Sequence, residues 1–118
     1  MTLNEYQERA MTTCMPSSEN FAYMMLNLVG EVGEIASKVG KYVRKGMVDI
    51  NDNHLDFYNS KKGDCIVELQ KEAGDVLWQL SGLCSVMGWK LDDIAQQNLD
   101  KLADRQQRHV IDGNGDER

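Results

Sequence analysis

Hydrophobic residues in the segment 64–87 recur with the spacing of an amphipathic helix. At about 100° per residue they fall within an arc of about 120°, the width of a stripe that faces a core. The stripe consists of Ile66, Leu69, Ala73, Val76, Leu77, Leu80, Leu83, Cys84 and Met87. Glu68, Glu72 and Asp75 lie just beyond one edge of this arc. The pattern therefore predicts a helix whose acidic side chains border the core.

The segment 20–45 shows the same pattern over an apolar arc of about 140°. That arc contains Phe21, Met24, Met25, Leu28, Val29, Val32, Ile35, Ala36, Val39, Tyr42 and Val43. Glu31 lies at one edge of the arc, and Glu34 stands about 60° further out. If the two long helices pack antiparallel, as a bundle permits, the pair Glu31 and Glu34 can face the pair Glu72 and Asp75.

Four helices account for most of the chain. The first must end before Pro16, because the residue before a proline avoids the helical conformation. Gly46 ends the second helix, and Asp92 is expected to cap the fourth. The predicted helices cover residues 3–11, 20–45, 64–87 and 92–108.

Two segments lack a helical pattern. Residues 47–63 are rich in Asp, Asn, Ser and Lys and are predicted to form a loop without strands, with a short helical turn around Leu55–Tyr58. Residues 110–118 are predicted to be a flexible tail. The predicted fold is all-α: a single domain over residues 1–118, in which a four-helix bundle pairs into a homodimer or a dimer of dimers. Trp78 lies away from the core arc and suggests a subunit interface.

Composition narrows the classes of function. The 118 residues suffice for one core, and the net charge of −6 is opposite in sign to that of a typical nucleic-acid binder. No apolar run approaches the roughly 20 residues of a membrane span, and the N-terminus lacks a signal peptide's basic and apolar regions. The three cysteines form no C-x-x-C pair. We expect a cytoplasmic protein with free thiols and without a nucleic-acid or membrane partner.

Four carboxylates at the edge of a core need a compensating charge, because like charges a few ångströms apart cannot all stay ionised in a partly dry site. Lysines could supply it, and so could a divalent metal. Magnesium is the natural choice because it prefers oxygen ligands, whereas the lack of histidine in the set argues against a di-iron site. The alternative is a solvated helix face on which Glu31 and Glu34 form ion pairs, at i+4 and i+7, with Lys38, Lys41 and Lys45.

Asn98, Lys101 and Arg105 lie on one stripe of the fourth helix, at positions i, i+3 and i+7. A metal held by carboxylates suits phosphate chemistry. Lysine can then bind phosphate as a point charge and arginine as a two-pronged donor. The fourth helix is therefore a candidate phosphate-binding element.

Several short motifs follow one another along the chain. They are Gly30–Glu34 (GEVGE), Glu72–Asp75 (EAGD), Asn98–Lys101 with Arg105, and the ending Gly115–Arg118 (GDER). The first two resemble the ExxE…ExxD signature of the MazG-like all-α nucleoside triphosphate pyrophosphohydrolases. The third resembles the Asn/Lys/Arg helix that follows in this family, and the ending is similar to the Gly-Asp-x-Arg terminus of small phage and bacterial members. The resemblance covers nearly the whole chain.

The resemblance implies hydrolysis of the bond between the α- and β-phosphates of an NTP or dNTP, for the removal of noncanonical or excess nucleotides. It implies Mg²⁺, or Mn²⁺ in its place, as the cofactor. The metal-ligand and catalytic positions are matched by Glu31, Glu34, Glu72 and Asp75. The phosphate-binding positions are matched by Asn98, Lys101 and Arg105. Glu31 and Glu34 are both candidates for the general base.

Three further residues are weaker candidates for the site. Lys38 could reach phosphates, Glu68 could act as a further ligand or support one, and Arg118 could fold over the phosphates with the tail. A rival hypothesis is a non-catalytic helical module that binds a metal or a partner helix. Another is an enzyme that cleaves the β–γ bond and releases orthophosphate.

Overall fold

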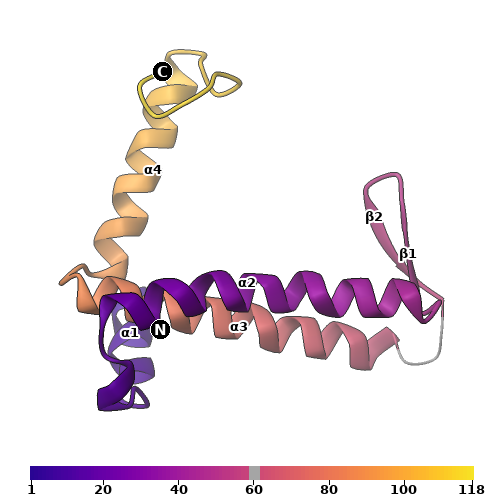
Figure 1. Cartoon of the computed structure of the whole chain (residues 1–118). Coiled ribbons are helices and arrows are strands. Elements are labelled where there is room, and N and C mark those ends of the chain that lie inside the picture. Colours follow the sequence, from indigo (N-terminus) through magenta and orange to yellow (C-terminus); the bar gives the residue numbers. More distant parts are fainter. Residues whose placement is uncertain (59–61) are drawn as a thin grey trace.

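The computed structural model describes residues 1–58 and 62–118, which contain four α-helices, a short 3-10 helix and a β-hairpin (Figure 1). The elements are α1 (Leu3–Met11), η1 (Pro16–Ser18), α2 (Phe21–Arg44), β1 (Val48–Asn51), β2 (His54–Phe57), α3 (Lys62–Val86) and α4 (Leu91–Gln107). Every helix end lies within about two residues of its predicted position, which is the usual uncertainty of a helix boundary. The mainly helical fold class is confirmed.

Helices α2 and α3 form the body of the molecule. They lie side by side and antiparallel, with the hairpin at one end of the pair (Figure 1). Asn20 begins α2 as its N-cap, because its side-chain oxygen accepts a hydrogen bond of 2.8 Å from the backbone N–H of Tyr23. This antiparallel pairing is what brings the acidic edge of α2 against that of α3.

The most deeply buried residues lie near the end of the pair where α1 packs. Met24 of α2 and Ser81 of α3 have no exposed surface. Gln7 of α1 is also buried, and its side-chain amide donates to the backbone oxygen of Trp89 (2.9 Å). Its amide oxygen accepts from the backbone N–H of Leu91 (2.9 Å). One glutamine thus ties α1 to the turn between α3 and α4.

The segment 47–63 is not the strandless loop that its composition predicts. Strands β1 and β2 pair antiparallel around a two-residue turn. The turn residues Asp52 and Asn53 have φ angles of 49° and 63°, and a turn with two positive φ angles matches the twist of the flanking strands. The helical turn predicted at Leu55–Tyr58 is wrong, because most of that segment belongs to β2.

Hydrophobic residues of the hairpin close the adjoining end of the helix pair. Val48 is buried together with Tyr42 of α2 and Cys65 of α3. Leu55 and Phe57 pack against this cluster and alternate with exposed residues along β2, as side chains on a half-covered strand do. The hairpin therefore exists because the ends of α2 and α3 offer it an apolar surface.

Helix α4 leaves the pair. It packs against α1 and points away from α2 and α3 (Figure 1). Asp92 does not cap it, because the N-cap position is Lys90; the backbone N–H of Asp92 instead donates to the side chain of Asn4 (2.9 Å). The radius of gyration is 17.7 Å, whereas a compact domain of this length has about 13 to 14 Å. The four helices of the described chain therefore do not close into a bundle by themselves.

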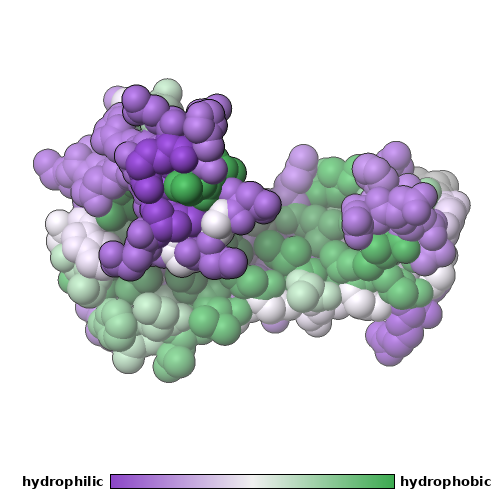
Figure 2. All heavy atoms as spheres, turned by 90° about the horizontal axis from the view of Figure 1, so that it is seen from above, coloured by the Kyte–Doolittle hydropathy of each residue, from purple (hydrophilic) through white to green (hydrophobic). Residues whose placement is uncertain are grey.

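The open arrangement leaves apolar side chains uncovered. Leu26 and Val29 of α2 are 72% and 68% exposed. Val29 belongs to the predicted core stripe, and Leu26 lies about 60° beyond the edge of that stripe. Hydrophobic surface follows the α2–α3 pair between α4 and the hairpin (Figure 2). Despite this surface, none of the described helices combines the length and apolar character of a membrane span.

Trp78 contacts the N-terminal part of the chain. Its indole N–H donates to the side-chain oxygen of Thr13 (2.9 Å) and to the backbone oxygen of Ala10 (3.2 Å). Helix α1 and the turn after it therefore cover part of this tryptophan, and its place at a subunit interface stays a prediction.

Candidate functional site

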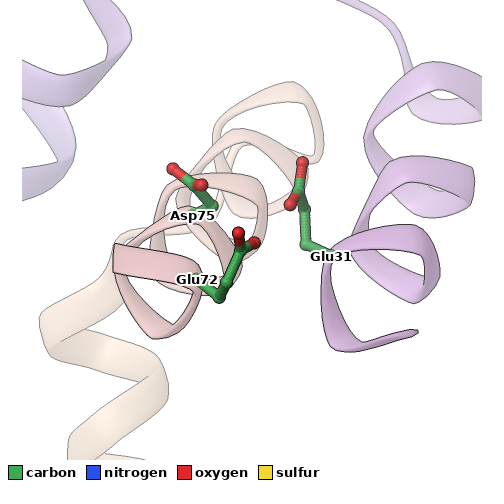
Figure 3. A group of neighbouring side chains, drawn as sticks. All are labelled: Glu31, Glu72 and Asp75. Atoms are coloured by element: carbon green, nitrogen blue, oxygen red, sulfur yellow. The ribbon is translucent and has the colours of Figure 1, made fainter. Parts of the chain in front are cut away.

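Three carboxylates from two helices lie close together near the middle of the α2–α3 pair (Figure 3). Glu31 comes from α2, and Glu72 and Asp75 come from α3. Each offers one oxygen, and these oxygens all lie within 4.8 Å of one another. Glu31 and Glu72 are half-buried, whereas Asp75 is exposed. We call these three residues the acidic cluster.

The charges of the acidic cluster act on one another and on a nearby tyrosine. The pKa of Glu31 is raised, first by burial and then by the negative charges of Asp75, Glu72 and Glu34. The pKa of the Tyr6 phenol in α1 is also raised, by burial and by Asp75. The cluster therefore has an excess of negative charge and attracts cations.

Lys38 provides one compensating charge. Its Nζ lies 2.9 Å from Oε1 of Glu72, whose side chain is only 13% exposed. The hydrogen bond to Glu72 is the main cause that raises the pKa of Lys38. Lys38 thus pairs across the two helices, whereas the alternative of a solvated helix face expects it to pair along α2.

Glu34 lies outside the acidic cluster. It is exposed, and its oxygens are not among those that converge with Glu31, Glu72 and Asp75. Its charge contributes to the raised pKa of Glu31, so it is close enough to act on the cluster electrostatically. Its role as a fourth ligand stays a prediction.

Glu68 is bound by a residue that sequence reasoning did not select. The buried hydroxyl of Tyr42 donates a hydrogen bond to it, and this bond is the main cause that lowers the pKa of Glu68. Burial and the same bond raise the pKa of Tyr42. Both residues line a cavity of about 250 Å³ between the cluster and the hairpin. A tyrosine on a core stripe does need a partner for its hydroxyl, which was the one available signal.

The cationic stripe on α4 does not reach the acidic cluster within one chain. Lys101 Nζ lies 3.2 Å from Oδ1 of Asp116, and Nη2 of the buried Arg105 lies 2.9 Å from the same oxygen. Asn98 and Lys101 line a shallow, open cavity of about 320 Å³ on α4. Both cations therefore hold the tail, and α4 points away from the cluster (Figure 1). Their role in phosphate binding stays a prediction.

Arg118 holds the tail against itself. Its guanidinium donates to the backbone oxygens of Gly115 (2.6 Å), Val110 (3.0 Å) and Ile111 (3.4 Å). The segment 110–118, expected to be flexible, is thus drawn into a set of turns at the end of α4. These contacts place Arg118 away from the acidic cluster, and the flexibility of the tail stays a prediction.

Comparisons with known proteins agree with the geometry. Residues 19–110 match the family model described as the MazG nucleotide pyrophosphohydrolase domain. The chain is also similar to the Gene 37 protein of Mycobacterium phage L5, with 38% identity over 102 residues that span 86% of this chain and 80% of the relative. No solved structure matches it. The matched region includes all three residues of the acidic cluster. Since the family model matches well over half of the chain, the chain belongs to the MazG nucleotide pyrophosphohydrolase domain family.

Proposed function

We propose that the protein is a Mg²⁺-dependent nucleoside triphosphate pyrophosphohydrolase. It would use one water molecule to break the bond between the α- and β-phosphates of an NTP or dNTP, releasing a nucleoside monophosphate and pyrophosphate. The convergence of Glu31, Glu72 and Asp75, in a chain of this family, is the observation that supports it. Such an activity would serve to remove noncanonical or excess nucleotides.

The acidic cluster fits a hard divalent cation. All three side chains offer oxygen, which Mg²⁺ prefers, and Mn²⁺ accepts the same ligands. Oxygens that share one Mg²⁺ at about 2.0–2.1 Å lie about 3 to 4 Å apart. Since the cluster oxygens already lie within 4.8 Å, small side-chain rotations would bring them to that spacing. A bound cation of this kind neutralises phosphate oxygens and lowers the pKa of water.

The protein must also remove a proton from the attacking water. Glu31 and Glu34 are the two candidates. Glu31 belongs to the acidic cluster, so a cation bound there would share its carboxylate. Glu34 lies outside the cluster, so its oxygens would stay free to accept the proton or to serve as a fourth ligand.

A second copy of the chain would complete the site. Asn98, Lys101 and Arg105 are the cationic and polar stripe expected to bind phosphate, yet α4 points away from the acids of its own chain. We therefore propose a homodimer or a dimer of dimers, in which exposed apolar faces of α2 and α3 pair. The stripe on α4 would approach the acidic cluster of a neighbouring chain.

Location in the cytoplasm also stays a prediction.

Product analysis with a panel of NTPs and dNTPs tests this function. We expect pyrophosphate and a nucleoside monophosphate, formed only when Mg²⁺ or Mn²⁺ is present. Asp75→Asn should lower kcat by at least about 100-fold, because it removes a charged ligand while keeping the shape of the side chain. Asp112→Asn, which alters an exposed acid of the tail, is the matched control and should retain activity.

Two other outcomes of this product analysis would each support one of the rival hypotheses. Release of orthophosphate would mean cleavage of the β–γ bond. Absence of turnover with every triphosphate, together with thermal stabilisation by Mg²⁺, would favour a non-catalytic metal-binding module.

A further inference from the structure

Lys38 contacts the acidic cluster, but the function proposed above gives it no role. Its ammonium lies 2.9 Å from Glu72, and Glu72 converges with Glu31 and Asp75. Lys38 follows Glu31 by seven residues on α2, about two turns, and this spacing places the two side chains on the same side of the helix. One carboxylate therefore belongs both to an existing ion pair and to the candidate metal site.

A lysine and a divalent cation would compete for this carboxylate. In the free protein, the ammonium offsets part of the negative charge of three acids. Once Glu72 binds a divalent cation, the same ammonium is held close to a like charge, and the half-buried position screens the repulsion poorly. The long side chain of lysine can leave without any change of backbone, because its stem has four rotatable carbons.

Glu68 is the other carboxylate of α3 near Lys38. It lies one turn before Glu72, it accepts the hydroxyl of Tyr42 with one oxygen, and its charge also acts on Lys38. A nucleotide drawn to a cation in the acidic cluster would add phosphate oxygens at the edge that Lys38 borders. Lysine binds such oxygens as a mobile point charge with three donors.

We propose that Lys38 exchanges partners when substrate binds: it neutralises Glu72 in the free protein and contacts a phosphate oxygen of the nucleotide once a divalent cation occupies the acidic cluster. This inference rests on the proposed function. It gives Lys38 two effects of opposite sign. The lysine weakens metal binding to the free protein, and it strengthens phosphate binding to the metal-loaded protein.

Two binding measurements on Lys38→Gln separate these effects. The first follows free Mn²⁺ by electron paramagnetic resonance during titration without nucleotide. Removal of the competing ammonium should tighten Mn²⁺ binding about three- to tenfold. The second measures binding of the preformed complex of Mn²⁺ with inorganic tripolyphosphate by calorimetry. Here the variant should bind at least about threefold more weakly than the wild type, because a phosphate contact is lost.

Two variants serve as controls. Lys41→Gln makes the same change of charge one turn further along α2, so it reports the long-range effect of net charge alone. It should alter both affinities by less than about twofold. Lys38→Arg keeps the positive charge and should restore phosphate binding toward the wild-type value. Circular dichroism verifies that each variant keeps its helices.

The outcomes distinguish this inference from the proposed function. If the wild type binds no Mn²⁺, the metal site of the proposed function fails, and the exchange fails with it. If the wild type binds Mn²⁺ but Lys38→Gln binds it equally or more weakly, the exchange alone is overturned. Equal losses of tripolyphosphate binding in Lys38→Gln and Lys41→Gln, or no tripolyphosphate binding by the wild type, would also overturn it.

Discussion

At the scale of single residues, Glu31 decides the character of the site. It stands at the edge of the apolar face of α2, where it is half-buried and meets the two acids of α3. Burial and these neighbours both oppose its ionisation and raise its pKa. Without a cation, the ionised Glu31 therefore lowers the stability of the folded protein at neutral pH, and a bound cation would relieve this effect.

This cost predicts a pH-dependent stability. Because the pKa of Glu31 is higher in the folded than in the unfolded chain, its contribution to the free energy of unfolding is greatest below about pH 4.3 and declines as pH rises through the raised pKa. In the presence of EDTA, Glu31→Gln should therefore have a higher Tm than the wild type at pH 7, by about 1–3 °C. The difference should shrink as the pH approaches 4. Thermal unfolding followed by circular dichroism measures both values.

A substitution that removes an acid from the tail is the control for Glu31→Gln. Glu117→Gln alters an exposed acid of the tail, and its Tm should follow that of the wild type across the same pH range. A Tm for Glu31→Gln at or below the wild-type value at pH 7 would contradict the electrostatic interpretation.

At the scale of elements, the close contact between α2 and α3 is made by a glycine and a methionine. A Cβ at Gly82 would lie 2.3 Å from the sulfur of Met24, and Met24 has no exposed surface. Since the side chain of Met24 is enclosed, it cannot swing into solvent to make room. The absence of a side chain at Gly82 thus allows α3 to approach α2 at this crossing.

Gly82→Ala should therefore destabilise the protein. We expect a loss of about 1–2 kcal/mol in the free energy of unfolding, because overpacking outweighs the better helix propensity of alanine. Gly40→Ala is the matched control, since no described atom lies within 4 Å of a Cβ there. It should be neutral or stabilise by up to about 1 kcal/mol. Urea denaturation compares the two, and equal stability would show that Met24 repacks without cost.

At the scale of the whole molecule, the open shape indicates that a partner covers part of the apolar surface. The radius of gyration of 17.7 Å exceeds the roughly 13 to 14 Å of a compact domain. Leu26 and Val29 are mostly exposed on α2, beside the acidic cluster in sequence. Exposed apolar patches of this kind usually mark interaction sites, and a second copy of the chain is the partner we propose.

A charge placed on this surface tests the proposed assembly. Sedimentation should give the wild type a mass of at least about twice the 13.4 kDa of one chain. Leu26→Glu should shift the mass toward that of one chain, because burial of an unpaired carboxylate costs several kcal/mol. Activity should fall with it by about tenfold or more, since the cationic stripe of α4 would no longer reach a neighbouring cluster.

Ile50→Glu makes the same kind of change in the hairpin, where Ile50 is 60% exposed, and it should leave the mass unaltered. A wild type that sediments as a single chain would exclude the proposed assembly.

The sequence alone determined the features that depend on local spacing. A period of 3.6 residues, together with Pro16 and Gly46, was enough to locate the helices. The same period placed Glu31 at the edge of one helix and Glu72 and Asp75 at the edge of another. Their convergence could be predicted because two amphipathic helices must bury their stripes against each other.

Only the tertiary structure decided what depends on contacts between distant residues. The hairpin is stabilised by the apolar surface that the ends of α2 and α3 offer to Val48. The alternation of Leu55, Asp56 and Phe57 after the turn is a local strand signal, but the polar composition of the segment outweighed it in the prediction of a loop. The direction of α4 follows from its contacts with α1. The spacing of Lys101 and Arg105 along α4 could not show that both bind Asp116 of the tail. Lys38 could have paired along its own helix, and only the packed pair of helices places it on Glu72. Spacing fixes which face a side chain occupies, whereas packing fixes what that face meets.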